Sequence, residues 1–171
     1  MGIFSSNGER LKSMNIYDKI LDSTQGKKKS ADWFRKQFFE LLQDSSNPIR
    51  RPKIGSLVYF EYENSNSKKN DRYPLVYVLE TYDDGFVGAN LHLLKPEKRV
   101  LLVEKLLNNS MSIPKSIITR YEDSKVTTSI YPVNKNDWSG SAKLPLEKFY
   151  TIKNKKQNSL EKEIVWKNGN R

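Results

Sequence analysis

The chain has 171 residues, with 30 Lys and Arg against 20 Asp and Glu, a net charge of +10 at pH 7 and no cysteine. This length fits one domain with extensions, and the lack of cysteine excludes disulfides, cysteine-based zinc sites and thiol catalysis. The charge favours an anionic partner without saying which one. No apolar run reaches the ~18 to 20 residues that cross a bilayer, so we expect no membrane partner.

The first 29 residues are expected to form an N-terminal arm. Apolar residues recur at three- or four-residue spacing over residues 9–21, which predicts a short amphipathic helix. A basic linker that contains Lys27, Lys28 and Lys29 follows it. A stronger helix is predicted after this linker, because Ser30 is a good N-cap and Phe34, Phe38, Leu41 and Leu42 share one face.

Residues 46–52 contain two prolines and end that helix. Residues 57–62, rich in aromatic and β-branched side chains, predict a strand, and residues 64–71 a polar loop. The segments 74–82 and 86–93 predict a hairpin, because Asp83-Asp84-Gly85 between them is a strong tight-turn signal.

The second half of the chain alternates between helix and strand signals. Pro96 at a first helical position, followed by Glu97 in the first turn, predicts a helix. We expect another short helix over residues 113–121 and a strand over 126–131. Residues 144–150 should fill the core with Leu144, Leu146 and Phe149, whereas residues 151–171 read as a basic C-terminal tail with a local apolar anchor at 164–166.

These elements predict an α+β protein: residues 30–150 form a small SH3-like or partly open β-barrel core with helices, which carries the N-terminal helical arm and the polar C-terminal tail. Segments such as the arm and the tail, with apolar anchors in a polar sequence, often become ordered on neighbouring subunits.

The sequence offers little for catalysis. His92 is the only histidine, and a lone histidine on a strand is usually a hydrogen-bonded structural residue. Glu80, Asp83 and Asp84 form the closest acidic cluster, but Asp also suits a hairpin turn for backbone reasons. No P-loop, dinucleotide or zinc-finger motif is present. We therefore expect no enzyme activity, no cofactor and no metal site.

Basic side chains beside aromatic ones remain as candidate contacts for nucleic acid or a protein partner, since they could neutralise phosphates without reading sequence. The alternative is that they are solvated surface charges. The candidates are Lys27, Lys28, Lys29, Arg35, Lys36, Arg50, Arg51 and Lys53.

The central block carries a resemblance to a known group of proteins. Residues 71–76 read Asp-Arg-Tyr-Pro-Leu-Val, and residues 84–96 include Gly-Phe-Val-Gly-Ala-Asn-Leu-His followed by a proline-initiated helix. Together with Ser-Ala-Asp-Trp-Phe-Arg-Lys at 30–36, and Trp138 followed by Leu-Pro-Leu-Glu-Lys-Phe, they resemble a family of small proteins of contractile-tailed bacteriophages. Leu93 departs from it, because the family has Tyr after the His. The structural motif comprises Gly85, Phe86, Gly88, Asn90 and His92.

The resemblance covers residues 30–150 and implies a phage setting without supplying a catalytic residue. We expect a non-enzymatic virion or assembly protein of the tail, neck or baseplate, assembled in the host cytoplasm. Its partners would be other phage structural proteins in a symmetric multi-copy assembly. The alternative is a sequence-independent DNA-binding protein that acts on genome ends or in replication. A metal-dependent nuclease comes third.

Overall fold

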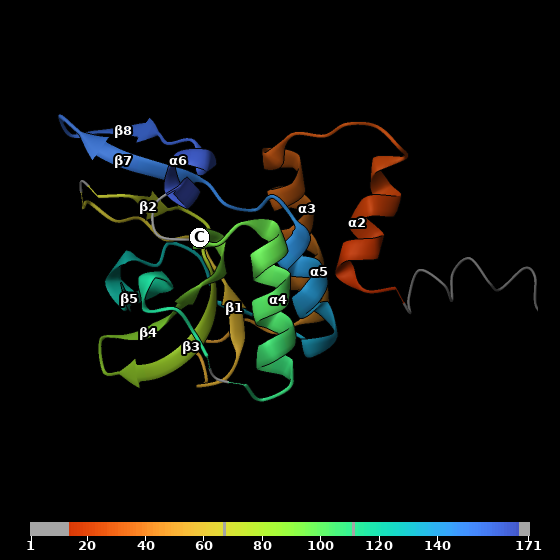
Figure 1. Ribbon diagram of the computed structural model, residues 1–171, viewed down its shortest axis with the longest axis horizontal. Coiled ribbons are helices and arrows are strands. Elements are labelled where there is room, and N and C mark those ends of the chain that lie inside the picture. The colour runs from red at the N-terminus through yellow and green to blue at the C-terminus, as the bar shows by residue number, and fades with distance from the viewer. Residues whose placement is uncertain (1–13, 67, 111, 168–171) are drawn as a thin grey trace, which may run out of the picture.

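The computed structural model describes residues 14–66, 68–110 and 112–167. Figure 1 shows two sheets with helices packed beside them. The helices are α2 (Ile16–Thr24), α3 (Ala31–Ser45), α4 (Pro96–Leu107), α5 (Trp138–Lys143) and α6 (Lys162–Lys167). The strands are β1 (Leu57–Tyr59), β2 (Asn70–Asp71), β3 (Leu75–Tyr82), β4 (Gly85–Asn90), β5 (Ile118–Glu122), β6 (Tyr131–Val133), β7 (Phe149–Lys153) and β8 (Lys156–Ser159).

The strands form two antiparallel sheets. The larger has the order β5-β4-β3-β1-β6 and the smaller the order β2-β7-β8. The α+β class predicted from the sequence is therefore confirmed. The larger sheet stays open, with β5 and β6 at its two edges, so neither sheet closes into a barrel.

Both faces of the larger sheet are buried, and this explains why its central strands are almost continuously apolar. In β1, Leu57 and Tyr59 join the larger core, whereas Val58 lies in the smaller core on the other face. Leu75 and Val76 of β3 divide between the two cores in the same way. This division follows from the period of two along a strand, which sends successive side chains to opposite faces.

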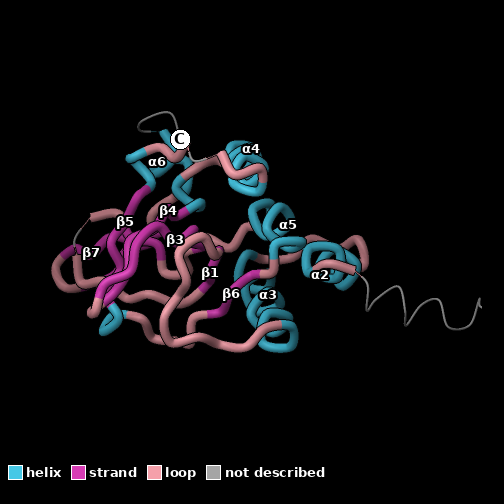
Figure 2. Tube along the Cα trace, turned by 90° about the horizontal axis from the view of Figure 1, so that it is seen from below, coloured by secondary structure: helices cyan, strands magenta, loops and turns pink. Residues whose placement is uncertain are grey.

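The helices gather on one side of the larger sheet. Figure 2 shows α3, α4 and α5 next to the strands, with α2 outside them. Phe38 and Leu42 of α3 and Val103 of α4 are buried in the larger core. The second face carries a tight aromatic group in which the Phe60 ring meets the Tyr121 ring edge-on at 5.4 Å.

The predicted hairpin is confirmed as β3 and β4, with Tyr82 paired to Gly85 across the turn. Gly88 lies at a point where β4 packs very closely against its neighbour β3. A Cβ atom there would lie 2.3 Å from Cγ1 of Val76 and 2.6 Å from the carbonyl oxygen of Tyr77. Only glycine fits this contact without displacing the neighbouring strand.

The two main helix predictions are confirmed. Ser30 is the N-cap of α3, where its Oγ accepts a hydrogen bond from the backbone N–H of Trp33 at 3.1 Å. Pro96 begins α4 at a first-turn position, where its missing N–H costs nothing.

Two predictions in the second half are wrong. Residues 113–121 contain a 3-10 turn, Lys115–Ile117, and then the edge strand β5 instead of a helix. The strand expected at 126–131 is instead β6, which begins at Tyr131 and includes Pro132. Proline is tolerated there because β6 is an edge strand.

In the described parts of the segments expected as arm and tail, residues 14–29 and 151–167, several side chains pack against the core. Residues 9–13 of the predicted first helix lie outside the described residues, but α2 follows, with Ile16 and Ile20 buried. The boundary expected at 150/151 falls within β7, so residues 151–167 contain strands β7 and β8 and helix α6. Trp166 of α6 is buried, as an anchor would be.

None of the helices among the described residues combines the length and the apolar character that a membrane crossing requires.

Candidate functional site

A buried carboxylate, Asp71, lies at the end of β2, where the small sheet meets the large one. Its Oδ2 lies 2.8 Å from Nδ1 of His92 and accepts a hydrogen bond from Nδ2 of Asn90 at 3.0 Å. Its Oδ1 accepts from the backbone N–H groups of Tyr73 at 3.2 Å and Lys148 at 3.1 Å. The carboxylate thus has four donors, which a buried charge needs.

The charge state of Asp71 follows from these contacts. Burial on its own would raise the pKa of the carboxyl, but the His92 ring and the hydrogen bonds from Asn90 and Lys148 outweigh it and lower the pKa below its usual value. The ionised carboxylate therefore accepts the hydrogen of Nδ1, which fixes the orientation of the His92 ring. The other ring nitrogen, Nε2, is buried and has no hydrogen-bond partner among the described residues.

A second buried pair lies beside the first. Arg99 of α4 is fully buried, and it donates from Nε to the carbonyl oxygen of Leu94 at 2.7 Å and from Nη2 to that of His92 at 3.2 Å. Its Nη1 is 3.2 Å from Oε2 of Glu147, close enough for an ion pair but not aligned as a hydrogen bond. Burial lowers the pKa of Arg99, and the Glu147 charge opposes that effect.

Distant helices complete this polar centre, a name we use for Asp71, Asn90, His92, Arg99 and Glu147. Nε1 of Trp166 in α6 donates to the carbonyl oxygen of His92 at 2.9 Å, and its ring faces the Arg99 guanidinium at 5.3 Å. From α3, Nη1 of Arg35 donates to the Glu147 carbonyl oxygen at 2.9 Å. The polar centre therefore joins α3, α4, α6 and both sheets.

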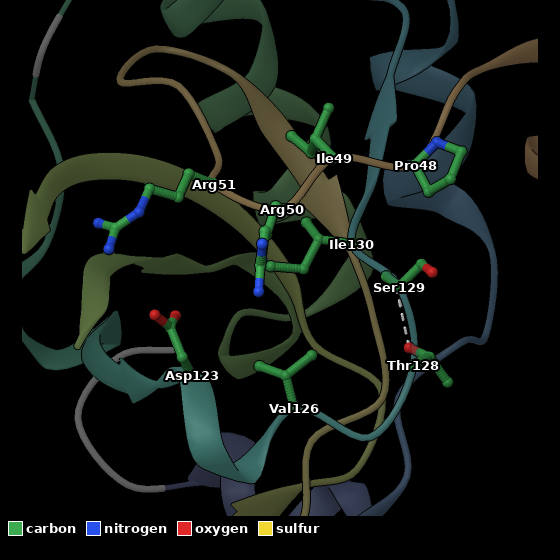
Figure 3. A pocket seen from close by; sticks show the side chains of 9 residues that line it. All are labelled: Pro48, Ile49, Arg50, Arg51, Asp123, Val126, Thr128, Ser129 and Ile130. Carbon is green, nitrogen blue, oxygen red and sulfur yellow. Dashed lines mark hydrogen bonds between the residues drawn. The ribbon is translucent and has the colours of Figure 1, made fainter. Parts of the chain in front are cut away.

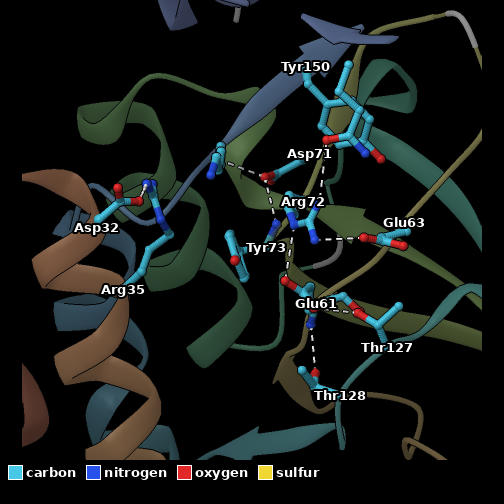
Figure 4. Close-up of polar contacts among 12 residues, drawn as sticks. Asp32, Arg35, Glu61, Glu63, Asp71, Arg72, Tyr73, Thr127, Thr128 and Tyr150 are labelled. Carbon is cyan, nitrogen blue, oxygen red and sulfur yellow. Dashed lines mark hydrogen bonds and ion pairs between the residues drawn. The ribbon is translucent and has the colours of Figure 1, made fainter. Parts of the chain in front are cut away.

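A partly buried ion network lies next to the polar centre (Figure 4). Nε of Arg72 is 3.1 Å from Oε2 of Glu61, and Nη2 is 2.7 Å from Oε1 of Glu63. Nη1 also donates to Oε1 of Gln157 in β8 at 3.3 Å. The Glu61 carboxyl is partly buried, which would raise its pKa, but hydrogen bonds from Thr127 and Arg72 lower it overall. The network links the segment after β1 to the small sheet.

An open cleft of about 810 Å³ lies beside the smaller core, on the face of the larger sheet opposite helices α3 and α4 (Figure 3). Two segments line it, residues 48–51 and part of 123–130. They meet where the Ile49 N–H donates to the Ile130 carbonyl oxygen at 2.8 Å. The lining residues are Pro48, Ile49, Arg50, Arg51, Asp123, Val126, Thr128, Ser129 and Ile130.

The predicted basic contacts do not form one surface. Lys27, Lys28 and Lys29 lie on the connection between α2 and α3, where Nζ of Lys29 sits 5.2 Å from the centre of the Trp33 ring. Lys36 is exposed on α3. Arg35 is buried. Its guanidinium pairs with Asp32 and donates to the Glu147 carbonyl oxygen, so Arg35 contributes to the fold rather than to an accessible surface.

The second predicted basic group lies on the sheet side. Arg50 and Arg51 both line the cleft, whereas Lys53 is exposed outside it. Arg51 donates from Nη1 to the Tyr82 carbonyl oxygen and from Nη2 to that of Asp83, each at 2.7 Å, and so holds the β3–β4 turn.

The residues of the predicted structural motif lie along and beyond β4. Gly85 and Phe86 begin the strand, and Gly88 makes the close contact with β3. Asn90 ends the strand, and its Oδ1 accepts from the backbone N–H of His92 at 3.1 Å. This bond starts the 3-10 turn that carries His92 into the polar centre.

The acidic cluster is divided among other contacts. Oε2 of Glu80 accepts a hydrogen bond from the Tyr82 hydroxyl, and Asp84 pairs with Arg120 at 2.7 Å. Over the described ranges 14–66, 68–110 and 112–167, no group of three or more His, Asp or Glu side chains could hold a metal ion.

Sequence reasoning missed Asp71, Arg99 and Glu147 as members of a polar centre. Arg99 did leave a signal, because it lies three and four positions before the buried Leu102 and Val103 and therefore on the same face of α4. Asp71 and Glu147 lie within the motifs that carry the family resemblance, but nothing in their local sequence indicates that they are buried.

Comparison with known proteins identifies no relative: no protein-family model matches the chain, and no curated protein or solved structure is significantly similar to it.

Proposed function

We propose that this protein is a non-enzymatic component of a bacteriophage virion that binds other structural subunits. The observation that carries the proposal is that the side chains best suited to catalysis are buried and bonded within the protein. Asp71, His92, Arg99 and Glu147 are all buried and contact one another or the backbone. A catalytic group must reach its substrate, so this arrangement supports a stabilising role for the polar centre.

The exposed apolar side chains support a binding role. Ile54 is 65% exposed, Leu101 57% and Ile164 48%, and they belong to three different segments: the loop before β1, helix α4 and helix α6. Leu101 also lines a groove of about 270 Å³ along α4, flanked by Lys98 and Lys105. Subunits of large assemblies make several contacts at once, each with its own surface. The phage setting rests on the motif resemblance over residues 30–150.

Quantitative mass spectrometry of virions, purified from an infection in which the phage encodes this chain, tests the proposal. We expect the chain in the purified particles at a constant ratio to a major structural protein. Its absence from the particles would overturn the virion assignment. A Mg²⁺-dependent DNA-cutting activity that the double substitution Asp83→Ala and Asp84→Ala abolishes would overturn the non-enzymatic assignment.

A second candidate function, sequence-independent DNA binding, is favoured by the lysines near α3. Lys27 and Lys28 on the α2–α3 connection and Lys36 in α3 are all exposed, within a chain of net charge +10. Binding through phosphate contacts should weaken steeply as salt rises. The measurement is the affinity for a duplex oligonucleotide at low and moderate salt, for the wild type and for the triple alanine variant at these lysines. A flat salt response would exclude this function.

A further inference from the structure

Three aliphatic side chains line the cleft beneath Arg50 among its polar ones. Ile130 belongs to the smaller core, and Ile49 and Val126 pack against that core from its edge. All three also line the cleft. Ile49 and Val126 are partly exposed and offer aliphatic contact area to a ligand, whereas Ile130 is buried and continues them into the core.

The charged groups of the cleft have unequal roles. Both Nη atoms of Arg51 are bound to the carbonyl oxygens of Tyr82 and Asp83. Arg50 is exposed and makes no hydrogen bond or ion pair with any described residue, and Figure 3 shows its side chain extending into the space above Asp123 and Val126. Arg50 is thus a free guanidinium, held beside an aliphatic surface.

The chemistry of an occupant follows from this lining. A free guanidinium presents a planar pair of donors that matches a carboxylate or a phosphate. Asp123, on the same cleft, would repel a ligand with negative charge all along its length. None of the nine lining residues is aromatic, so none can stack a nucleic-acid base. A single acidic group next to an aliphatic one fits better than a polyphosphate chain.

We propose that this cleft binds an extended peptide segment of another protein subunit, in which Asp or Glu neighbours an aliphatic residue. The carboxylate pairs with Arg50, and the aliphatic side chain packs on the exposed parts of Ile49 and Val126. The inference rests on the proposed function, because it gives the chemical class of the partner that such an assembly protein would hold. A volume of about 810 Å³ accommodates several side chains.

A library of random decapeptides displayed on yeast, sorted against the labelled full chain, tests the proposal. We expect the enriched peptides to place Asp or Glu beside Leu, Ile or Val. Arg50→Glu should weaken their binding by about 10- to 100-fold, because it replaces a charge-assisted contact by repulsion. Ser129→Trp, which fills the exposed cleft without changing charge, should weaken it as well.

Lys53→Glu is the matched control, because it makes the same change of charge three residues away and outside the cleft. It should leave peptide binding within about twofold of the wild type, an effect typical of screened surface charges. Circular dichroism and a urea midpoint confirm that each variant folds, which is expected because Arg50, Lys53 and Ser129 are exposed.

Three results would overturn the proposal: no enriched peptide, enriched peptides without acidic residues, or equal binding by Arg50→Glu and wild type. A fourth is binding of a labelled single-stranded oligonucleotide that Arg50→Glu and Ser129→Trp abolish, since the cleft would then take nucleic acid. The detection of the chain in virions by mass spectrometry does not depend on peptide binding to the cleft. A failure of the virion assignment is therefore distinguishable from a failure of the peptide site.

Discussion

Nδ1 of His92 lies 2.8 Å from Oδ2 of Asp71, and this contact joins the end of β2 to the turn after β4 across 21 positions of sequence. Both side chains are buried. The pair is therefore one of the buried contacts that connect the two sheets.

Removing the charge of Asp71 should destabilise the protein strongly. Asp71→Asn retains the shape of the side chain but turns one acceptor into a donor that faces other donors, so we expect a loss of about 3 kcal/mol in the free energy of unfolding. Urea titration followed by circular dichroism measures it. Asp123→Asn, at an exposed carboxylate, is the control and should change stability by less than about 0.5 kcal/mol. Equal effects of the two substitutions would contradict the role of the pair.

The pH dependence of stability should follow the same carboxylate. The pKa of Asp71 is lowered in the folded protein, whereas an unfolded aspartate titrates near about 3.9. The folded state therefore binds this proton less readily than the unfolded state. Its stabilising contribution is complete above about pH 3.9 and is lost as the pH falls through the lower folded pKa.

Urea midpoints of wild type and Asp71→Asn, measured at neutral pH and at steps below about pH 4, test this linkage. We expect the difference between the two proteins to shrink as the pH falls, because only the wild type loses the contribution of the ionised carboxylate. A constant difference over the whole range would show that Asp71 has an ordinary pKa.

The anchor in α6 gives a third prediction. Trp166→Ala removes a buried ring and the hydrogen bond from its Nε1 to the His92 carbonyl oxygen. We expect a loss of about 3 kcal/mol in unfolding free energy, measured by chemical denaturation. Ile164→Ala on the same helix changes a side chain that is 48% exposed and should cost far less. If both changes cost the same, α6 does not cover the polar centre as described.

Two glycines should respond to alanine for different reasons. Gly88→Ala places a Cβ atom 2.6 Å from the Tyr77 carbonyl oxygen, so the β3–β4 pair must shift, and we expect a loss of about 3 kcal/mol. Gly26→Ala meets no atom within 4 Å but has a φ of +73°, which costs about 1 to 2 kcal/mol. Thermal unfolding of both variants shows which loses more stability. A larger loss for Gly26→Ala would contradict the close contact between Gly88 and β3.

The sequence predicts elements whose signals are local. Ser30, Pro96 and the turn before Gly85 each specify a helix start or a hairpin through short-range contacts, and the structure contains all three. The segment 113–121 is predicted as a helix with Pro114 near its start. Most of it is instead a strand, because Gly85 to Ala89 of β4 offer an edge with which it pairs, a tertiary effect that local signals do not reveal.

The β7–β8 hairpin leaves a weak local signal in the sequence. Asn154 and Lys155 form its two-residue turn, with φ values of 54° and 62°. Asn is favoured at the first of these positions, but the usual glycine at the second is replaced by lysine, which conceals the pattern. The polar centre could not be predicted in this way, because Asp71, His92 and Glu147 come from separate parts of the chain.

The position of Trp166 has a consequence for how the protein is made. Helix α6 follows every other described element in chain order, so during translation it leaves the ribosome after both sheets. Until then the carbonyl oxygen of His92 lacks its indole donor and the Arg99 guanidinium lacks its aromatic cover. Nascent chains that stop before α6 would therefore leave this side of the polar centre open to solvent.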